Sequence, residues 1–414
     1  MEKLQTVRVN GRDYKRPTVP VVVICCDGSE PEYIDLARSR QIMPNLDRIL
    51  ENGENLLASS VIPSFTNPNN LSIVTGRPPS VHGISGNFFH DRESGSEVMM
   101  NDPKYLRSPT LFSGFQEAGW SVAVITAKDK LRRLLGHGLS FDQGTAVCFS
   151  SERAGDCTLA ENGIEGVLEL VGMPVPEVYS LGLSEFVFSA GCRVLESMRP
   201  DVMYLSTTDY IQHKHAPGTE GANEFYRMMD GYLGTLHESG AIIVLTADHG
   251  MKAKHNADGS PDVVYLQDVL DKWLGRDAAK VILPITDPYV VHHGALGSFA
   301  TVYLPEGSDV DTIIKRIASL PGIDVVLDRK EGCARFELPE DRLGDLIIVS
   351  GGSKVIGTRE TEHDLSTLNE PLRSHGGLDE QIVPMIINRP VKEVPRPLRN
   401  FDAFHVGLNI AGKV

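Results

Sequence analysis

Short, continuous runs of apolar residues alternate along the chain with segments of helical periodicity. The runs are rich in β-branched residues and cover Val21–Cys26, Ser121–Thr126, Val202–Ser206 and Ile242–Thr246. Between them, Met43–Glu51 and a segment from about Ser184 to Met198 place apolar residues at helical spacing. Strands that are apolar on both faces and alternate with helices are typical of a parallel sheet covered by helices. We therefore predict an α/β fold built on a mostly parallel sheet.

The pattern of apolar runs along the sequence changes after Gly250. With 414 residues, the chain is long enough for a second compact unit. Residues 263–349 hold shorter strand-like runs, Phe299–Leu304 and Leu346–Ser350, and a helical pattern near Val310–Ser319. The first pattern resumes at "SHGGLDEQIVPMII". We predict a core formed by residues 1–250 and 375–414, with residues 251–374 inserted as a smaller α+β lid.

The charge balance of the chain excludes several classes of partner. It holds 40 basic and 55 acidic residues, a net charge of −15, which disfavours nucleic acids and anionic membranes. No apolar stretch reaches the ~18 residues of a spanning helix, and the first residues lack the apolar region of a secretory signal. The six cysteines are scattered, which suits reduced thiols, so we expect a cytoplasmic protein. The sequence does not fix the oligomeric state, and a homodimer stays open.

Polar residues follow three of the predicted strands at the point where each strand ends. Asp27 ends the first strand, "STTD" leads to Asp209, and "TADHG" brings Asp248 and His249. The carboxyl ends of parallel strands meet at one edge of a sheet, where ligands bind. An ordinary turn is the alternative for Asp27, because Asp-Gly is a common turn pair. The recurrence at three strand ends favours a binding site.

Two more histidines extend this set to six candidate metal ligands. His213 lies four residues after Asp209 in "DYIQH", so one helical turn presents both to one side. His375 lies in the glycine-rich "SHGG". Each histidine alone is more often a satisfied polar residue, but three Asp and three His together suit zinc. Six ligands exceed the needs of one tetrahedral ion, so we predict two Zn²⁺ per chain.

Thr66 is the candidate nucleophile. In "PSFTNPNNLSIVTGRPP", Pro68 suits the first turn of a helix, which places Thr66 at or just before its N-terminus. The alternative is an ordinary helix cap. However, unpaired N–H groups at a helix N-terminus bind anions, and a hydroxyl beside a divalent ion can attack phosphorus.

The order of these residues resembles the alkaline phosphatase superfamily, and within it the nucleotide pyrophosphatase/phosphodiesterase branch. The matching motifs, which include "TGRPPSVHGI", "TADHGM" and "SHGG", span Val21 to about Ile387 apart from the insertion. The resemblance implies an alkaline-phosphatase-like sheet that carries the metals. It implies that one zinc binds Asp209, His213 and His375. It implies that the other zinc binds Asp27, Thr66, Asp248 and His249.

Further segments resemble the phosphonoacetate hydrolases, bacterial enzymes that cleave a carbon–phosphorus bond. These segments are "CCDGSEPEYID", "FTNPNN", "SGNFFHD" and "TAKDKL". The resemblance implies hydrolysis of phosphonoacetate to acetate and phosphate through a phosphothreonine at Thr66. It implies that Asn87 contacts a phosphonate oxygen and that Lys128 and Lys130 bind the small anionic substrate, which His213 also contacts.

The chemistry of the bond agrees with two lysines near the site. A carbon–phosphorus bond breaks heterolytically only if the departing carbon can hold negative charge, which a neighbouring carboxylate spreads. Lys128 and Lys130 lie just past the predicted strand Ser121–Thr126 and could supply cations there. At an effective dielectric near 20, a charge pair at ~4 Å is worth about 4 kcal/mol. The alternative for both lysines is an ordinary solvated loop.

Two other functions stay open at this point. A phosphodiesterase or nucleotide pyrophosphatase on the same di-zinc scaffold would need aromatic residues to stack on a nucleoside. Phe88 and Phe89 could serve, although only 7% of the chain is aromatic. A catalytically silent metal-binding protein would have lost a ligand or the nucleophile, whereas every expected position is filled.

Overall fold

A seven-stranded sheet forms the centre of the larger part of the molecule. The computed structural model describes residues 5–286, 294–366, 368 and 370–412. In spatial order the strands are β4 (Glu54–Ser59), β19 (Ile382–Ile387), β10 (Ile242–Thr246), β3 (Val21–Cys25), β9 (Val202–Ser206), β7 (Val122–Thr126) and β8 (Ala146–Ser150). The last five are mutually parallel, whereas β19 runs antiparallel to β10 and β4. The predicted mostly parallel sheet is confirmed.

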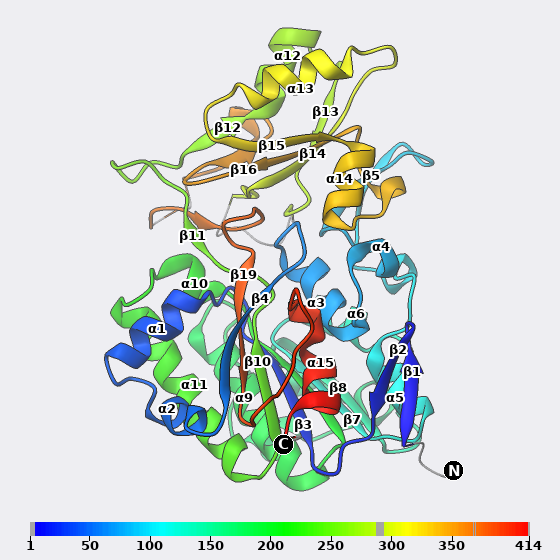
Figure 1. The fold of residues 1–414 in the computed structure, drawn as a ribbon, viewed down its shortest axis with the longest axis vertical. Coiled ribbons are helices and arrows are strands. Elements are labelled where there is room, and N and C mark those ends of the chain that lie inside the picture. The colour runs from blue at the N-terminus through cyan, green and yellow to red at the C-terminus, as the bar shows by residue number, and fades with distance from the viewer. Residues whose placement is uncertain (1–4, 287–293, 367, 369, 413–414) are drawn as a thin grey trace.

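Helices cover both faces of this sheet (Figure 1). Alternate residues of β3 point to opposite faces, so Val22 and Ile24 join one core cluster while Val21 and Val23 join another. The helices of the first cluster are α1 (Pro31–Ser39), α2 (Pro44–Leu50), α9 (Leu181–Met198) and α11 (Glu220–Glu238). Those of the second are α3 (Thr66–Thr75), α5 (Leu111–Glu117), α6 (Asp129–Leu135) and α15 (Ala403–His405).

A smaller antiparallel sheet of four strands lies at the top of Figure 1, above the main sheet. Its strands are β13 (Lys280–Ile282), β14 (Phe299–Tyr303), β16 (Leu346–Ser350) and β15 (Ile323–Asp328). Its helices are α12 (Leu266–Leu274), α13 (Val310–Ala318) and α14 (Arg329–Phe336). These elements share a core cluster of their own. The division at residues 250 and 375, and the role of a lid, stay predictions.

Two short pairings join the larger and the smaller parts. β11 (Lys252–Ala253) and β18 (Arg373–Ser374) pair antiparallel where the chain passes from one part of the molecule to the other. The hairpin of β5 (Phe88–Asp91) and β6 (Ser96–Met99) follows Asn87, whose backbone N–H donates to the carbonyl of Pro284 at 2.8 Å. The smaller sheet is therefore fixed against the face of the molecule where α3 begins.

Short elements complete the described chain. They are β1 (Thr6–Val9), β2 (Arg12–Lys15), α4 (Pro79–His82), α7 (Leu159–Asn162), α8 (Val167–Val171), α10 (Tyr210–Lys214), β12 (Val263–Tyr265) and β17 (Val355–Gly357). Every helix in the part of the chain that the structure describes is too short or too polar to cross a membrane.

Candidate metal centre and active site

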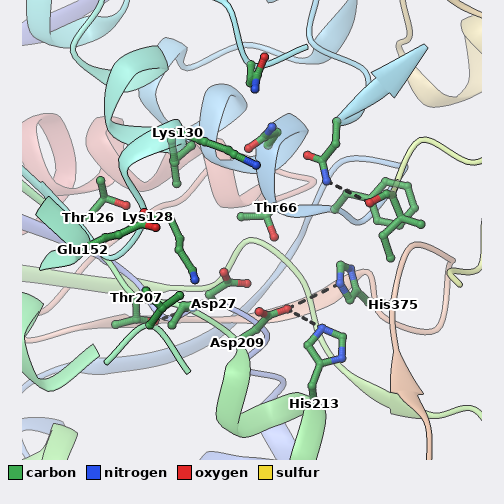
Figure 2. Close-up of a pocket in the computed structure, with 18 of the residues that line it drawn as sticks. Asp27, Thr66, Thr126, Lys128, Lys130, Glu152, Thr207, Asp209, His213 and His375 are labelled. Carbon is green, nitrogen blue, oxygen red and sulfur yellow. Dashed lines mark hydrogen bonds and ion pairs between the residues drawn. The ribbon is translucent and has the colours of Figure 1, made fainter. Parts of the chain in front are cut away.

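The predicted metal ligands converge at one edge of the main sheet. Figure 2 shows four of them: Asp27, Asp209, His213 and His375. Asp27 follows β3, Asp209 follows β9, and Asp248 and His249 follow β10. Because these three strands are parallel neighbours, their carboxyl ends lie side by side. His375 follows β18 and completes the set from a distant part of the sequence. All six side chains are buried, and they form two groups of three.

The first group consists of Asp209, His213 and His375. Asp209 Oδ2 lies 2.9 Å from Nε2 of His213 and 3.7 Å from Nε2 of His375. Asp209 directly precedes α10, and the helical turn that follows brings His213 onto the same side, as the four-residue spacing predicts.

Backbone carbonyls fix the orientation of both imidazoles in this group. Nδ1 of His213 lies 2.7 Å from the carbonyl oxygen of Arg373, and Nδ1 of His375 lies 2.8 Å from that of Ser64. A carbonyl oxygen can only accept, so each Nδ1 donates to it, and each Nε2 faces the carboxylate of Asp209. Metal-ligating histidines have this arrangement, with one nitrogen held by the protein and the other presented to the ion.

The second group consists of Asp27, Asp248 and His249. Nε2 of His249 lies 3.3 Å from Asp27 Oδ1 and 3.8 Å from Asp248 Oδ2. Its Nδ1 lies 2.8 Å from the carbonyl oxygen of Gly250, so this imidazole also presents Nε2. Asp27 Oδ1 is buried and has no hydrogen-bond donor among the described residues. An orphaned carboxylate oxygen of this kind fits a cation.

A glycine allows the two groups to approach each other. Gly28 has a φ of +69°, and a Cβ there would lie 2.9 Å from the Cβ of Asp209. Its backbone N–H donates to Oδ1 of Asp248 at 3.2 Å. A side chain at this position would therefore separate Asp209 from Asp248.

The electrostatics of the site also favour bound cations. Burial, followed by the negative charges of Asp209 and Asp248, raises the pKa of Asp27 well above its usual value. Burial likewise raises the pKa of Asp248. Burial, and then the neighbouring His249, lowers the pKa of His375. The imidazole rings of His249 and His375 stack, with their centroids 3.6 Å apart. Carboxylates and imidazoles in a buried site form a donor set that suits Zn²⁺.

Thr66 is the first residue of α3 and is not its cap. Phe65 occupies the N-cap position, where no side chain bonds to the first turn. The Thr66 hydroxyl therefore does not cap α3, which was the alternative to a nucleophile. Instead, Oγ1 of Thr66 lies 3.3 Å from Nε2 of His249, beside the second group. Asn70, one turn along α3, donates from Nδ2 to Asp248 Oδ2 at 3.1 Å.

The donor groups open into a cavity of ≈ 190 Å³. Lys128 precedes α6 and Lys130 lies in its first turn. Figure 2 shows that their ammonium groups point toward the space around Thr66 and Asp27. Asn87 donates from Nδ2 to the carbonyl of Ile285 at 3.2 Å. All of the predicted substrate-binding residues line this cavity: Thr66, Asn87, Lys128, Lys130 and His213.

Several residues of the site were not among the predictions. Glu152 lines the cavity and follows β8, a strand that was not predicted from the sequence. The sequence of β8, "AVCFS", is followed by polar residues. Asp27 was identified by the same signal, a polar residue at the end of an apolar run. Asn70 and Tyr179 carry no such signal, because one lies inside a helix and the other in a loop.

The two donor groups at one edge of a mostly parallel sheet point to a metal-dependent enzyme, and a comparison with protein families identifies its class as a hydrolase family. Residues 21–378 match the family model described as Type I phosphodiesterase / nucleotide pyrophosphatase. The chain belongs to this family.

Within the solved structures, the chain is similar to phosphonoacetate hydrolase from Sinorhizobium meliloti 1021. Two structures of that protein, in complex with phosphonoformate and with phosphonoacetate, match with 61% identity and a TM-score of 0.96. Each match covers 100% of both chains. A phosphonoacetate hydrolase from Penicillium oxalicum is 62% identical over 32 residues, which is 8% of this chain and 44% of that protein.

More distant relatives share the fold. An uncharacterized pyrophosphatase/phosphodiesterase from Schizosaccharomyces pombe is 25% identical over 268 residues. The match covers 63% of this chain and 46% of that protein. Murine ectonucleotide pyrophosphatase / phosphodiesterase 5 is 17% identical, with a TM-score of 0.63 over 95% of this chain and 96% of its own. At that identity the likeness shows the architecture alone.

Proposed function

We propose that this chain hydrolyses the carbon–phosphorus bond of phosphonoacetate to acetate and phosphate, in a zinc-dependent reaction. The observation that carries the proposal is the similarity, 61% identical over the whole of both chains, to a phosphonoacetate hydrolase solved with phosphonoacetate. The cavity supports it, because Lys128 and Lys130 lie beside the candidate nucleophile Thr66.

Two zinc ions per chain would use the two donor groups. Asp209, His213 and His375 would hold one ion. The other would be held by Asp27, Thr66, Asp248 and His249. When bound, zinc lowers the pKa of a hydroxyl that it contacts and balances the charge of phosphoryl oxygens. Asn70 and the backbone of Gly28 keep the carboxylate of Asp248 oriented for this role.

Thr66 would supply the attacking oxygen. Oγ1 forms a bond to phosphorus as the carbon–phosphorus bond breaks, and the electron pair of that bond passes to the departing carbon. The hydroxyl proton of Thr66 is lost, and one proton is taken up by the carbon to give acetate. Water then displaces Oγ1 from phosphorus, which releases phosphate and restores the hydroxyl. The N-terminal position of Thr66 on α3 directs backbone N–H groups at the phosphoryl oxygens.

The lysines would stabilise charge that develops during bond cleavage. The electron pair left on carbon spreads onto the substrate's carboxylate, which gains negative charge in the transition state. An ammonium group beside it stabilises the transition state more than the ground state, and only that difference raises the rate. Asn87, whose amide is held by the carbonyl of Ile285, is assigned to a phosphonate oxygen.

The alternative, a phosphodiesterase or nucleotide pyrophosphatase, receives less support from the cavity. Phe89 is buried and packs edge-on against Tyr105, with ring centroids 5.7 Å apart. Neither Phe88 nor Phe89 is among the described residues that line the cavity, where the aromatic side chains are those of Phe65 and Tyr179. The cavity volume of ≈ 190 Å³ is also below the roughly 300–1,000 Å³ usual for larger ligands.

The test compares two substrates with the same zinc-loaded protein. We expect kcat/KM for phosphate release from phosphonoacetate to exceed kcat/KM for a nitrophenyl phosphodiester, which lacks the carboxylate. A preference for the diester would support the alternative function on the same scaffold and reject the proposed one.

A further inference from the structure

A tyrosine at the mouth of the cavity contacts one of the two lysines. The Lys128 ammonium lies 5.2 Å from the centroid of the Tyr179 ring. Both residues line the cavity. Tyr179 belongs to the loop between α8 and α9 and is 42% exposed, so its ring separates the lysine from part of the solvent.

The ring of Tyr179 is itself supported by the metal-binding part of the core. It packs against the ring of Tyr210, with centroids 5.8 Å apart and planes tilted by 44°. Tyr210 directly follows Asp209 and is the first residue of α10, the helix that carries His213. The loop of Tyr179 is therefore positioned relative to the first donor group, and Lys128 is positioned relative to that loop.

An aromatic ring can hold an ammonium group in place. A lysine ammonium sits on a flexible four-carbon stem and can occupy many positions. The face of a ring attracts the ammonium through its quadrupole and adds no net charge to the cavity.

We propose that Tyr179 is a positioning residue that holds the Lys128 ammonium in place for the anion bound beside Thr66. The inference rests on the proposed function only in taking Lys128 as a substrate-binding group. Tyr179 contributes through its ring face, and its hydroxyl is not needed.

The test is the binding of phosphonoacetate, and separately of inorganic phosphate, to zinc-loaded protein, measured by calorimetry. Tyr179→Leu removes the ring and should weaken binding of phosphonoacetate about fivefold to tenfold, the range expected of such a contact. Binding of inorganic phosphate, which lacks the carboxylate, should weaken less. Tyr179→Phe keeps the ring and should bind within about twofold of wild type. In a Lys128→Met background, Tyr179→Leu should cause less than about a twofold further loss, because the pair acts as a unit.

A matched control lies outside the cavity. The Lys104 ammonium lies 5.0 Å from the ring centroid of Tyr105, and neither residue is among those described as lining the cavity. Tyr105→Leu should leave binding of both anions unchanged. A loss in Tyr179→Phe equal to that in Tyr179→Leu would overturn the proposal, as would an undiminished loss in the Lys128→Met background.

Measuring binding separates this inference from the proposed function. If phosphonoacetate binds with the expected coupling but is not hydrolysed, the proposed function fails and the role of Tyr179 stands. If hydrolysis proceeds and no coupling is found, only the role of Tyr179 is rejected. If neither anion binds to the wild type, both are rejected.

Discussion

Thr66 combines a local helix position with a place beside the second donor group. Its hydroxyl makes no cap for α3 and lies 3.3 Å from His249 Nε2. We expect Thr66→Ala to abolish phosphonoacetate turnover while leaving most of the zinc bound, since the other ligands remain. Thr66→Ser keeps the oxygen and should retain part of the rate. Activity assays and elemental analysis of the same samples check both expectations.

The covalent step at Thr66 has its own measurement. A single turnover with enzyme in excess is quenched in acid and examined by mass spectrometry. A phosphoryl group mapped to Thr66 supports the two-step route. Direct attack by water would give phosphate without an enzyme adduct at any quench time, and near-normal activity of Thr66→Ala would reject Thr66 as nucleophile.

The two lysines of the cavity make a second prediction at the scale of single residues. Lys128→Met and Lys130→Met should each lower kcat/KM for phosphonoacetate by roughly 10²-fold or more, a loss near 3 kcal/mol. Zinc content should not change, since neither residue belongs to a donor group. A nitrophenyl ester without the carboxylate should suffer much less. Equal losses on both substrates would assign the lysines to the phosphoryl end, and no loss would make them ordinary surface charges.

At the scale of elements, the sequence predicted four strands of the main sheet, β3, β7, β9 and β10, and missed the buried strand β8. Val202–Ser206 and Ile242–Thr246 are strands with the predicted bounds, and β3 and β7 differ by one residue. Continuous apolar runs identify such strands because both of their faces are covered. The edge strand β4 was not predicted, since its half-exposed pattern, with Leu57 59% exposed, gives no continuous run.

The candidate ligands could be predicted because they follow such strands. The backbone groups that orient the ligands could not be predicted. Strand ends in a parallel sheet have a fixed place, so Asp27, Asp209 and Asp248 were identified from position alone. The carbonyl groups of Arg373 and Ser64 that orient the histidines are backbone atoms. They depend on how distant loops pack, and no residue type marks them.

A buried ion pair links the loops that carry His249 and His375. Lys254 and Glu380 are fully buried and lie 2.8 Å apart. The carboxylate of Glu380 also accepts from the backbone N–H of Gly377 at 2.9 Å. The backbone carbonyl of Glu380 accepts from the backbone N–H of Gly250 at 2.7 Å. Lys254 donates to the carbonyl of Gly352 at 2.9 Å. The pair therefore fixes both loops against the smaller sheet.

Removing one member of this pair should be costly. Glu380→Ala leaves a buried ammonium without its partner, so we expect a loss of roughly 3 kcal/mol or more in the free energy of unfolding. Denaturant unfolding of zinc-loaded protein measures it. The double variant Lys254→Met with Glu380→Leu should recover much of the loss. Glu196→Ala, which breaks an exposed pair with Arg193, is the control and should change little. A similarly small effect of Glu380→Ala would contradict the account.

At the scale of the whole molecule, the site draws on both parts of the structure. Thr66 and the six donors come from the core that surrounds the main sheet, whereas Ile285, which holds the Asn87 amide, follows β13 of the smaller sheet. The composition change after Gly250 predicted a second unit. The contact of the β5–β6 hairpin with this unit could not be predicted, because it joins residues far apart in the chain.

Metal removal should affect the stability of the whole protein. Without cations, Asp27 and Asp248 lie close together in a buried site, and burial raises the pKa of both carboxyl groups. An ion that binds only the folded state stabilises it, by about 4 kcal/mol when present at 1,000 times its Kd. We expect chelation to lower Tm at neutral pH and added zinc to restore it. An unchanged Tm after verified removal of metal would contradict the assignment of the donor groups.

The central claim is that this chain cleaves a carbon–phosphorus bond at a zinc-dependent site. The most direct measurement is the release of acetate and phosphate from phosphonoacetate by zinc-loaded protein, before and after treatment with a chelator. The account predicts equimolar acetate and phosphate, loss of both on chelation, and recovery when zinc is returned. No release by zinc-loaded protein, or release that chelation leaves unchanged, would contradict it.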